Sequence, residues 1–363
     1  MPQNTTFFSR GETPTFVNYV IAHNKARPPG IVPVVCGSCG LPGAELLQVR
    51  THYRDRQKER NGSMKRIVLL LLVGLLTLFA GCGGKKAPAK TAEGRLPVVA
   101  SFYAMKEITE AIGGDKVAVT TLIPEGTEPH EFQPTTRSMK DLSRARVLVL
   151  QGLGMEPWAE DMVKAAENPG LVQVTAARDV APIANEDAEE IREHGQYDPH
   201  AWLSPSCAQV EAAAIVRGLS QADPDNAAYY QANGEKFIGR LRQLEKTYKE
   251  KFQSVPRKDF VTGHAAFAYL CRDFGLEQNS VEGVFASGEP NARQLAKLVE
   301  YCREHQVNTI FTEAAVSPKT SQALAREVGA KVVPIHTLEG GEGEGDYLQQ
   351  MEENLVRIYE SLK

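Results

Sequence analysis

Residues 223–256 read DPDNAAYYQANGEKFIGRLRQLEKTYKEKFQSVP, and this stretch sets the organisation of the chain. Asp223 can cap a helix and Pro224 suits a first helical turn, whereas Pro256 cannot continue a helix. Apolar residues recur at helical spacing in between, at Phe237, Leu241, Leu244 and Tyr248. The stretch therefore predicts one long helix between the segments on its two sides, not a loose linker.

Short apolar segments alternate with helical stretches on both sides of this helix. Those before it are residues 96–101, 116–123 and 145–152, and those after it are residues 259–263, 307–312 and 331–336. Strands that alternate with helices form parallel sheets in βα units. We therefore expect an α/β fold with two lobes, each a mainly parallel sheet flanked by helices, joined by one long helix. The expected parts are an N-terminal lobe at 96–222, the helix at 223–256 and a C-terminal lobe at 257–363.

A leader-like segment stands inside the chain, not at its start. MKRIVLLLLVGLLTLFAGC, residues 64–82, has two basic residues, a short apolar run and small residues before Cys82. A membrane span needs about 20 apolar residues, and this run is shorter. The order of basic, apolar and small residues therefore fits a secretory signal better than a membrane span. The end of the run resembles a lipoprotein processing site, which predicts a signal peptide at 64–81 and a lipid on Cys82. Residues 82–95 are Gly-, Ala- and Lys-rich, as expected for a flexible tether.

The residues upstream of this signal show no clear helical or strand period. They include CGSCG at residues 36–40, but no second pair follows at the spacing of a zinc site. We interpret residues 1–63 as a non-native upstream extension, with translation starting at Met64. Three further cysteines, Cys207, Cys271 and Cys302, are expected to be buried small side chains, although Cys271 and Cys302 are candidates for a disulfide.

Composition narrows the classes of partner. The 363 residues are 42% apolar and 24% charged, with a net charge of −4, which is typical of a globular protein. The part after residue 81 carries more net negative charge than the whole chain, because basic residues outnumber acidic ones among the first 81 residues. An exported acidic domain suits a cationic ligand and argues against a nucleic-acid partner.

Four potential metal ligands lie in loops of the two lobes. His130 lies in LIPEGTEPHEFQPT after the segment 116–123, and His200 lies in YDPHAWLSP. His264 and Glu313 each follow a strand of the second lobe, in TGHAAFAYL and FTEAAVSP. Loops at the carboxyl ends of parallel strands meet in the crevice where ligands bind, so these side chains can meet in one cleft. Three imidazoles and one carboxylate suit a divalent d-block cation better than Ca²⁺ or Mg²⁺.

From residue 96 to residue 362 the chain resembles the metal-binding lipoproteins of bacterial ABC importers for zinc and manganese. The resemblance rests on ordered motifs: PVVASFY, GTEPHEFQPT, GLGMEPW, DPHAWLSP, the long helix, HAAFAYL and TIFTEAAVSPK. It implies that His130, His200, His264 and Glu313 are the ligands of a transported metal. It also implies a monomer that delivers this metal to an ABC permease. The lipid on Cys82 would hold it at the bacterial membrane, facing the periplasm or the cell exterior.

The ligand types favour zinc as the bound substrate. Manganese-type members tend to carry a carboxylate at the third position and aspartate at the fourth, whereas this chain has His264 and Glu313. A nitrogen-rich tetrahedral site suits Zn²⁺ better than Mn²⁺, although Mn²⁺ or Fe²⁺ remains an alternative. The loop before His200 is short and acidic, with the single extra histidine His194, where zinc members often carry a His-rich loop. His336 is a reserve candidate for the fourth ligand.

Two other classes of protein fit some of the same residues. A zinc hydrolase would use the three histidines as ligands and Glu313 as general base, but the chain has neither an HExxH helix nor a nucleophile elbow. We therefore expect no enzyme activity. A surface adhesin built on the same lobes is the other alternative, and it would bind its partner whether or not metal is present.

Overall fold

The computed structural model describes residues 90–91, 93–130, 132–185, 191–192, 195–286, 292–314, 318–341 and 343–363. The predicted upstream extension, the signal peptide, Cys82, most of the tether and His194 lie outside these residues. In the part of the chain described, no helix combines the length and apolar character that a membrane crossing requires.

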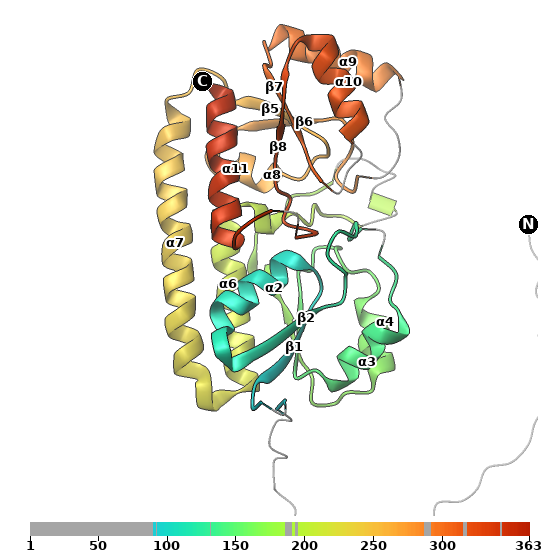
Figure 1. The fold of residues 1–363 in the computed structure, drawn as a ribbon, viewed down its shortest axis with the longest axis vertical. Coiled ribbons are helices and arrows are strands. Elements are labelled where there is room, and N and C mark those ends of the chain that lie inside the picture. Colours follow the sequence, from blue (N-terminus) through green and yellow to red (C-terminus); the bar gives the residue numbers. More distant parts are fainter. Residues whose placement is uncertain are drawn as a thin grey trace, which may run out of the picture. The chain divides into compact units, whose positions relative to one another are not determined.

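The N-terminal lobe is built on a four-stranded parallel sheet. Its strands run in the order β2 (Val117–Thr121), β1 (Leu96–Ala100), β3 (Val147–Leu150) and β4 (Val172–Thr175). One face is covered by α2 (Tyr103–Gly113) and α6 (Pro205–Ala222), and the other by α3 (Thr136–Arg144) and α4 (Ala159–Ala166), as Figure 1 shows. Strand β3 is buried along its whole length, as expected for a central parallel strand.

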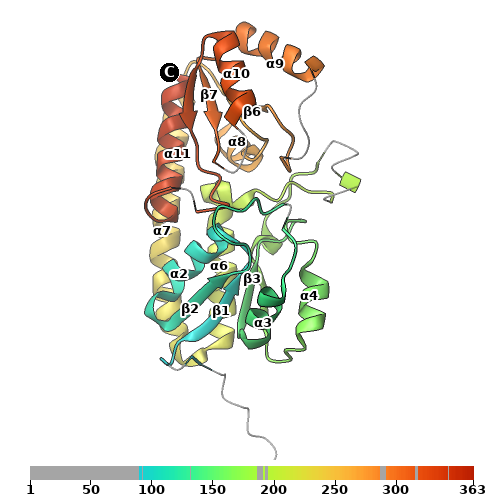
Figure 2. The same ribbon diagram turned by 45° about the vertical axis from the view of Figure 1, so that its right-hand side comes forward.

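The C-terminal lobe repeats this plan. Its parallel sheet has the order β6 (Glu277–Ser280), β5 (Asp259–Thr262), β7 (Thr309–Thr312) and β8 (Lys331–Pro334). The helices of this lobe are α8 (Ala268–Phe274), α9 (Ala292–Glu304), α10 (Pro318–Val328) and α11 (Tyr347–Leu362). Helix α11 lies beside α7 in both views (Figure 1 and Figure 2). The predicted fold class is therefore confirmed.

The long helix α7 (Ala227–Gln253) extends along both lobes (Figure 2). The four apolar residues that predicted it are all buried, and Tyr230 and Phe252 extend the same buried stripe. One apolar core cluster includes residues of both lobes, from Leu96 to Leu362. Because the helix contributes to this shared core, it joins the lobes as a packed element and limits how far they can separate.

The start of α7 differs from the prediction. A short 3₁₀ turn, Pro224–Asn226, precedes the helix, and the Asp223 side chain caps neither element. Its carboxylate instead accepts hydrogen bonds from the Asn226 amide at 2.7 Å and the Tyr230 hydroxyl at 3.0 Å. Lys90 forms an ion pair with the same carboxylate at 3.1 Å. Asp223 thus fixes the corner between α6 and α7 and holds the segment that enters the lobe.

Three cysteines, Cys207, Cys271 and Cys302, are buried and free in the described structure. This agrees with their expected role as small buried side chains, and the structure does not form the alternative disulfide between Cys271 and Cys302. Trp202 is fully buried, packs against Phe102 at a centroid distance of 4.8 Å, and donates its indole N–H to the Thr337 carbonyl.

Candidate metal centre

Four buried side chains converge between the lobes: His130, His200, His264 and Glu339. The Nε2 atom of His200 lies 3.3 Å from that of His130 and 3.4 Å from that of His264. Glu339 Oε1 lies 3.5, 3.4 and 3.9 Å from the Nε2 atoms of His130, His200 and His264, respectively. A tetrahedral Zn²⁺ site with bonds of about 2.0–2.1 Å has edges of about 3.3–3.4 Å. Four of these five distances are close to the edges of a zinc site, and the distance from Glu339 to His264 is longer.

His130 is held by the loop between β2 and α3. The Glu128 carboxylate accepts a hydrogen bond from the backbone N–H of His130 at 3.2 Å, and the ring packs edge-on against Phe285 with centroids 5.2 Å apart. The Gly126 N–H donates to the Gly340 carbonyl at 2.8 Å, which joins this loop to the one that carries Glu339. Glu128 therefore shapes the loop that carries His130, and burial raises the pKa of its own carboxyl to about 7.

His200 is held in a tight turn by Asp198. One carboxylate oxygen, Oδ1, lies 2.8 Å from the His200 backbone nitrogen and 2.9 Å from the ring Nδ1. The carboxylate holds the ring proton on Nδ1, so Nε2 keeps a free lone pair that points at the cluster. The turn leads into a 3₁₀ segment, Ala201–Leu203, and does not directly follow a strand. The Gln151 side chain donates to the Pro199 carbonyl at 3.1 Å and supports the turn from the core.

His264 follows β5 and is held in the same way by Glu313. Glu313 Oε2 lies 2.5 Å from the ring Nδ1 of His264, and its Oε1 accepts hydrogen bonds from the N–H groups of Gly263 and His264 at 3.1 and 3.2 Å. A Cβ atom at Gly263 would lie 2.9 Å from Glu313 Oε2. Only glycine lets the backbone approach this carboxylate without displacing it.

The structure does not place the expected fourth ligand in the cluster. Glu313 was expected in the cluster, but its carboxylate contacts the Nδ1 side of His264, away from the converging Nε2 atoms. The reserve candidate His336 is also elsewhere, since its Nε2 lies 3.1 Å from Glu353 and 3.0 Å from Arg357. Glu339 takes the position instead. It follows β8, so it obeys the same strand-end rule that indicated the other residues.

The surroundings of Glu339 fit a bound cation. The residue is 1% exposed, and neither carboxylate oxygen has a hydrogen-bond partner within the described structure. Burying an anion without donors is costly unless a positive charge compensates it. Three imidazole Nε2 atoms face the same point, so a metal at their centre would bind all four groups.

For each of these groups, burial and the neighbouring charges change the pKa in opposite directions. Burial lowers the pKa of His130 to about 4, despite the Glu339 carboxylate nearby. Burial alone would lower the pKa of His264, but the charge and hydrogen bond of Glu313, together with the charges of Glu339 and Glu128, outweigh burial and raise this pKa to about 10. Burial alone would raise the pKa of Glu339, but the imidazoles of His130 and His200 hold it well below its usual range. The site is thus electronegative, with a proton held at His264.

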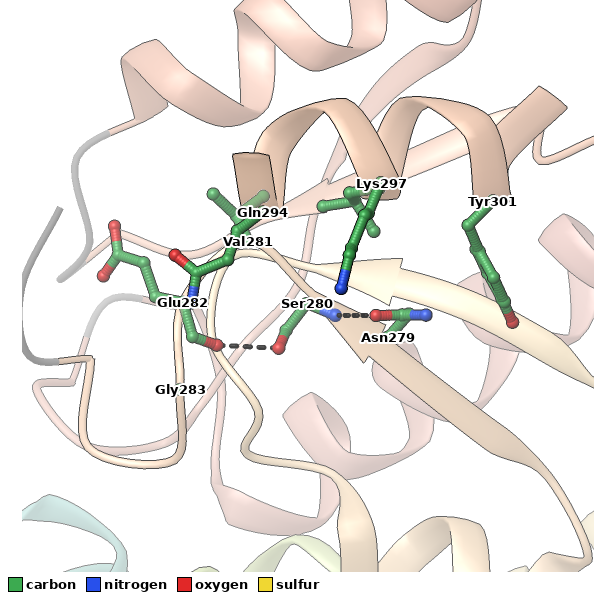
Figure 3. Close-up of a pocket in the computed structure, with 9 residues that line it drawn as sticks. Asn279, Ser280, Val281, Glu282, Gly283, Gln294, Lys297 and Tyr301 are labelled. Atoms are coloured by element: carbon green, nitrogen blue, oxygen red, sulfur yellow. Dashed lines mark hydrogen bonds between the residues drawn. The ribbon is translucent and has the colours of Figure 1, made fainter. Parts of the chain in front are cut away.

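A separate pocket of about 460 Å³ opens in the C-terminal lobe, between the end of β6 and α9 (Figure 3). Ser280, Lys297 and Tyr301 are among the residues that line it, and the Ser280 hydroxyl donates to the Glu282 carbonyl at 2.7 Å. None of the four converging side chains lines this pocket. The metal centre is instead buried between the lobes.

Two parallel α/β lobes, a long connecting helix and a buried three-histidine, one-carboxylate site define a metal-binding solute-binding protein. The chain belongs to the family described as zinc-uptake complex component A, periplasmic, which matches residues 98–361. This is a family of solute-binding proteins for zinc transport, and the predicted resemblance is therefore confirmed.

The matches to two relatives span nearly the whole length of each relative. The high-affinity zinc uptake system protein ZnuA of Bacillus subtilis is 35% identical over 309 residues, which are 81% of this chain and 97% of the relative. A Treponema pallidum protein named for metal binding is 39% identical over 300 residues, 80% of this chain and 95% of its own. The solved laminin-binding protein of Streptococcus agalactiae superposes with a TM-score of 0.68 at 32% identity, covering 74% of this chain and all of that one.

Proposed function

We propose that this protein binds Zn²⁺ outside the cytoplasm as cargo and delivers it to an ABC permease. The observation that carries the proposal is the near-tetrahedral set of three Nε2 atoms and one carboxylate oxygen between the lobes. His130, His200 and His264 supply the nitrogens, and Glu339 supplies the oxygen. Glu313 and Asp198 orient two of the rings. The zinc-uptake name of the Bacillus subtilis relative supports the same cargo.

Zinc is favoured over manganese and iron by the type and number of donors. Mn²⁺ prefers more oxygen ligands and higher coordination, whereas this site offers one carboxylate among three imidazoles. In competition experiments on metal-stripped protein, we expect Zn²⁺ to displace Mn²⁺ and Fe²⁺ with one ion bound per chain, measured by calorimetry and elemental analysis. Displacement of bound Zn²⁺ by equimolar Mn²⁺ would contradict the assignment.

The contacts of the two carboxylates, Glu339 and Glu313, favour a transport role over catalysis. A hydrolytic zinc site keeps one coordination position for water and needs a free general base nearby. Here four side chains face the metal position, and the Glu313 carboxylate is engaged by His264 and two backbone N–H groups. We therefore propose a binding protein without enzyme activity, acting as a monomer.

An adhesin role is a second candidate because the Streptococcus agalactiae structure is described as a bifunctional protein with adhesin and metal-transporting activity. An experiment on metal dependence distinguishes the adhesin role from the transport role. Host-protein binding that is unchanged after chelation of the metal would support an adhesin surface, whereas the transport role requires metal-dependent recognition by a permease.

Export and anchoring complete the proposal. We propose that translation starts at Met64, that residues 64–81 are removed, and that Cys82 carries the lipid that holds the protein at the membrane. Cys82→Ser should shift the protein from the membrane fraction to the soluble extracytoplasmic fraction, measured by fractionation and by the mass of the N-terminal peptide. Peptides from residues 1–63 in the mature protein would contradict this scheme.

A further inference from the structure

We propose that Tyr269, Arg272 and Asp273 of α8 form an interlobe clamp that positions His200 against His264. This inference rests on the proposed function, because the clamp matters only if these two histidines bind the same ion. Helix α8 begins at Ala268, four residues after His264, so it is closely coupled to one ligand. Its side chains reach across to the N-terminal segment that carries the other ligand, His200.

Tyr269 makes the central contact of the clamp. Its side chain is fully buried, and its hydroxyl donates to the Asp198 carbonyl at 2.6 Å. The same hydroxyl accepts a hydrogen bond from the Ile183 N–H at 3.1 Å. Asp198 in turn holds both the backbone and the ring of His200. A single hydroxyl of the C-terminal lobe therefore supports the residue that orients a ligand of the N-terminal lobe.

Arg272 and Asp273 fix the two ends of the same N-terminal segment. The Arg272 guanidinium donates to the Ala181 carbonyl at 2.8 Å and to Cys207 Sγ at 3.1 Å. The Asp273 carboxylate accepts a hydrogen bond from the Ser204 hydroxyl. These contacts lie before and after His200 in the chain. The clamp therefore contacts the N-terminal lobe both before and after His200.

A cavity beside the clamp explains why these polar contacts matter. It has a volume of about 690 Å³ and is lined by Ile183 and Asp198 from one lobe and by Ala265 and Arg272 from the other. Tyr269 also packs in an apolar cluster with Val180, Ala201 and Cys207 of the N-terminal lobe, and the hydrogen bonds of α8 add directional contacts beside this space. The 3.4 Å separation of the His200 and His264 Nε2 atoms then follows from the position of α8.

The test removes single hydroxyl groups from the full chain purified in detergent. Tyr269→Phe deletes the central clamp contact and keeps the ring, whereas Tyr230→Phe deletes an equally buried hydroxyl that binds Asp223 at the corner of α6 and α7. We expect Tyr269→Phe to weaken Zn²⁺ binding about 10-fold, in the range of changes to groups that orient metal ligands. The absorption spectrum of bound Co²⁺ should also change. Tyr230→Phe should lower thermal stability but leave the affinity and the spectrum unchanged.

The outcomes separate the clamp from the proposed function. If the parent chain binds neither Zn²⁺ nor Co²⁺, the proposed function fails and the clamp with it. If the parent binds both and Tyr269→Phe matches it in affinity and spectrum, the clamp alone is wrong. Equal weakening by both tyrosine variants would likewise overturn the clamp, since it would report a general loss of stability. Should Tyr269→Phe not fold, Arg272→Gln replaces it, with the same changes expected and the same result overturning the proposal.

Discussion

Replacing Glu339 by Gln will lower the affinity for Zn²⁺ by about 10³-fold, beyond the 10- to 100-fold typical of groups that only orient a ligand. The carboxylate is the single anionic member of the cluster, and its Oε1 lies 3.4–3.9 Å from all three Nε2 atoms. An amide at this position keeps the shape but removes the charge that attracts the cation. Calorimetry with a competing chelator on metal-stripped protein measures the change.

Glu313→Gln is the matched control, because it makes the same chemical change on the other side of His264. Its carboxylate touches Nδ1 and not the metal position, so we expect a loss of only 10- to 100-fold. A larger loss for Glu313→Gln than for Glu339→Gln would contradict the structure and return Glu313 to the role of ligand. Circular dichroism of both variants establishes that the fold is kept.

The positions of the three histidines could be predicted because a physical rule applies to them. His130 and His264 follow parallel strands, whose carboxyl ends meet at one edge of a sheet, and His200 lies in a proline-fixed turn. The same rule fits both Glu313 and Glu339. Sequence cannot separate them, because the choice depends on which side of the His264 ring each carboxylate reaches. In the structure Glu313 reaches the Nδ1 side of the ring, beside Gly263, and Glu339 faces the Nε2 side.

The central strands of both sheets and the edge strands β2 and β8 could be predicted, but the edge strands β4 and β6 could not. The central strands β1, β3, β5 and β7 each contain adjacent apolar residues, as in VLVL of β3 and TIFT of β7. Strands β4 and β6 were missed, and β6 reads EQNS without one apolar residue. An edge strand is stabilised largely by backbone hydrogen bonds to its neighbour, which a hydrophobic pattern does not reveal. The start of α7 was misplaced for a similar reason, because Asp223 binds tertiary partners instead of capping.

Lowering the pH from 7 to 5 will weaken Zn²⁺ binding by at least about 10²-fold, because protons compete with the metal for the imidazoles. In the metal-free protein the pKa of His264 is raised to about 10. Burial lowers the pKa of His200, but the charge and hydrogen bond of Asp198, together with the contact to Glu339, outweigh burial and raise this pKa. Both rings are therefore protonated at acid pH, and each must lose a proton before its Nε2 can bind Zn²⁺. Below the pKa of each ring, the affinity falls about tenfold per pH unit.

Protonation of any of the three histidines weakens Zn²⁺ binding, but each histidine is protonated in a different pH range. The pKa of His130 is about 4, so this ring is already neutral between pH 5 and pH 7 and adds nothing to the slope there. At pH 8, His264 is still mostly protonated. We therefore expect the uptake of one Zn²⁺ to release about one proton or more, detected as a dependence of the calorimetric heat on the ionisation enthalpy of the buffer.

The same control variant tests the cause of this proton release. Glu313→Gln removes the largest of the charges that raise the pKa of His264, so this pKa should fall and the proton release from this residue at pH 8 should decrease. The variant should then bind Zn²⁺ with a shallower dependence on pH than the parent, even though its affinity at pH 8 is lower. Unchanged proton release in Glu313→Gln would show that the contact between Glu313 and Nδ1 does not control the charge of His264. In that case Glu313 serves only to orient the ring, and the charges of Glu339 and Glu128 hold the proton on His264.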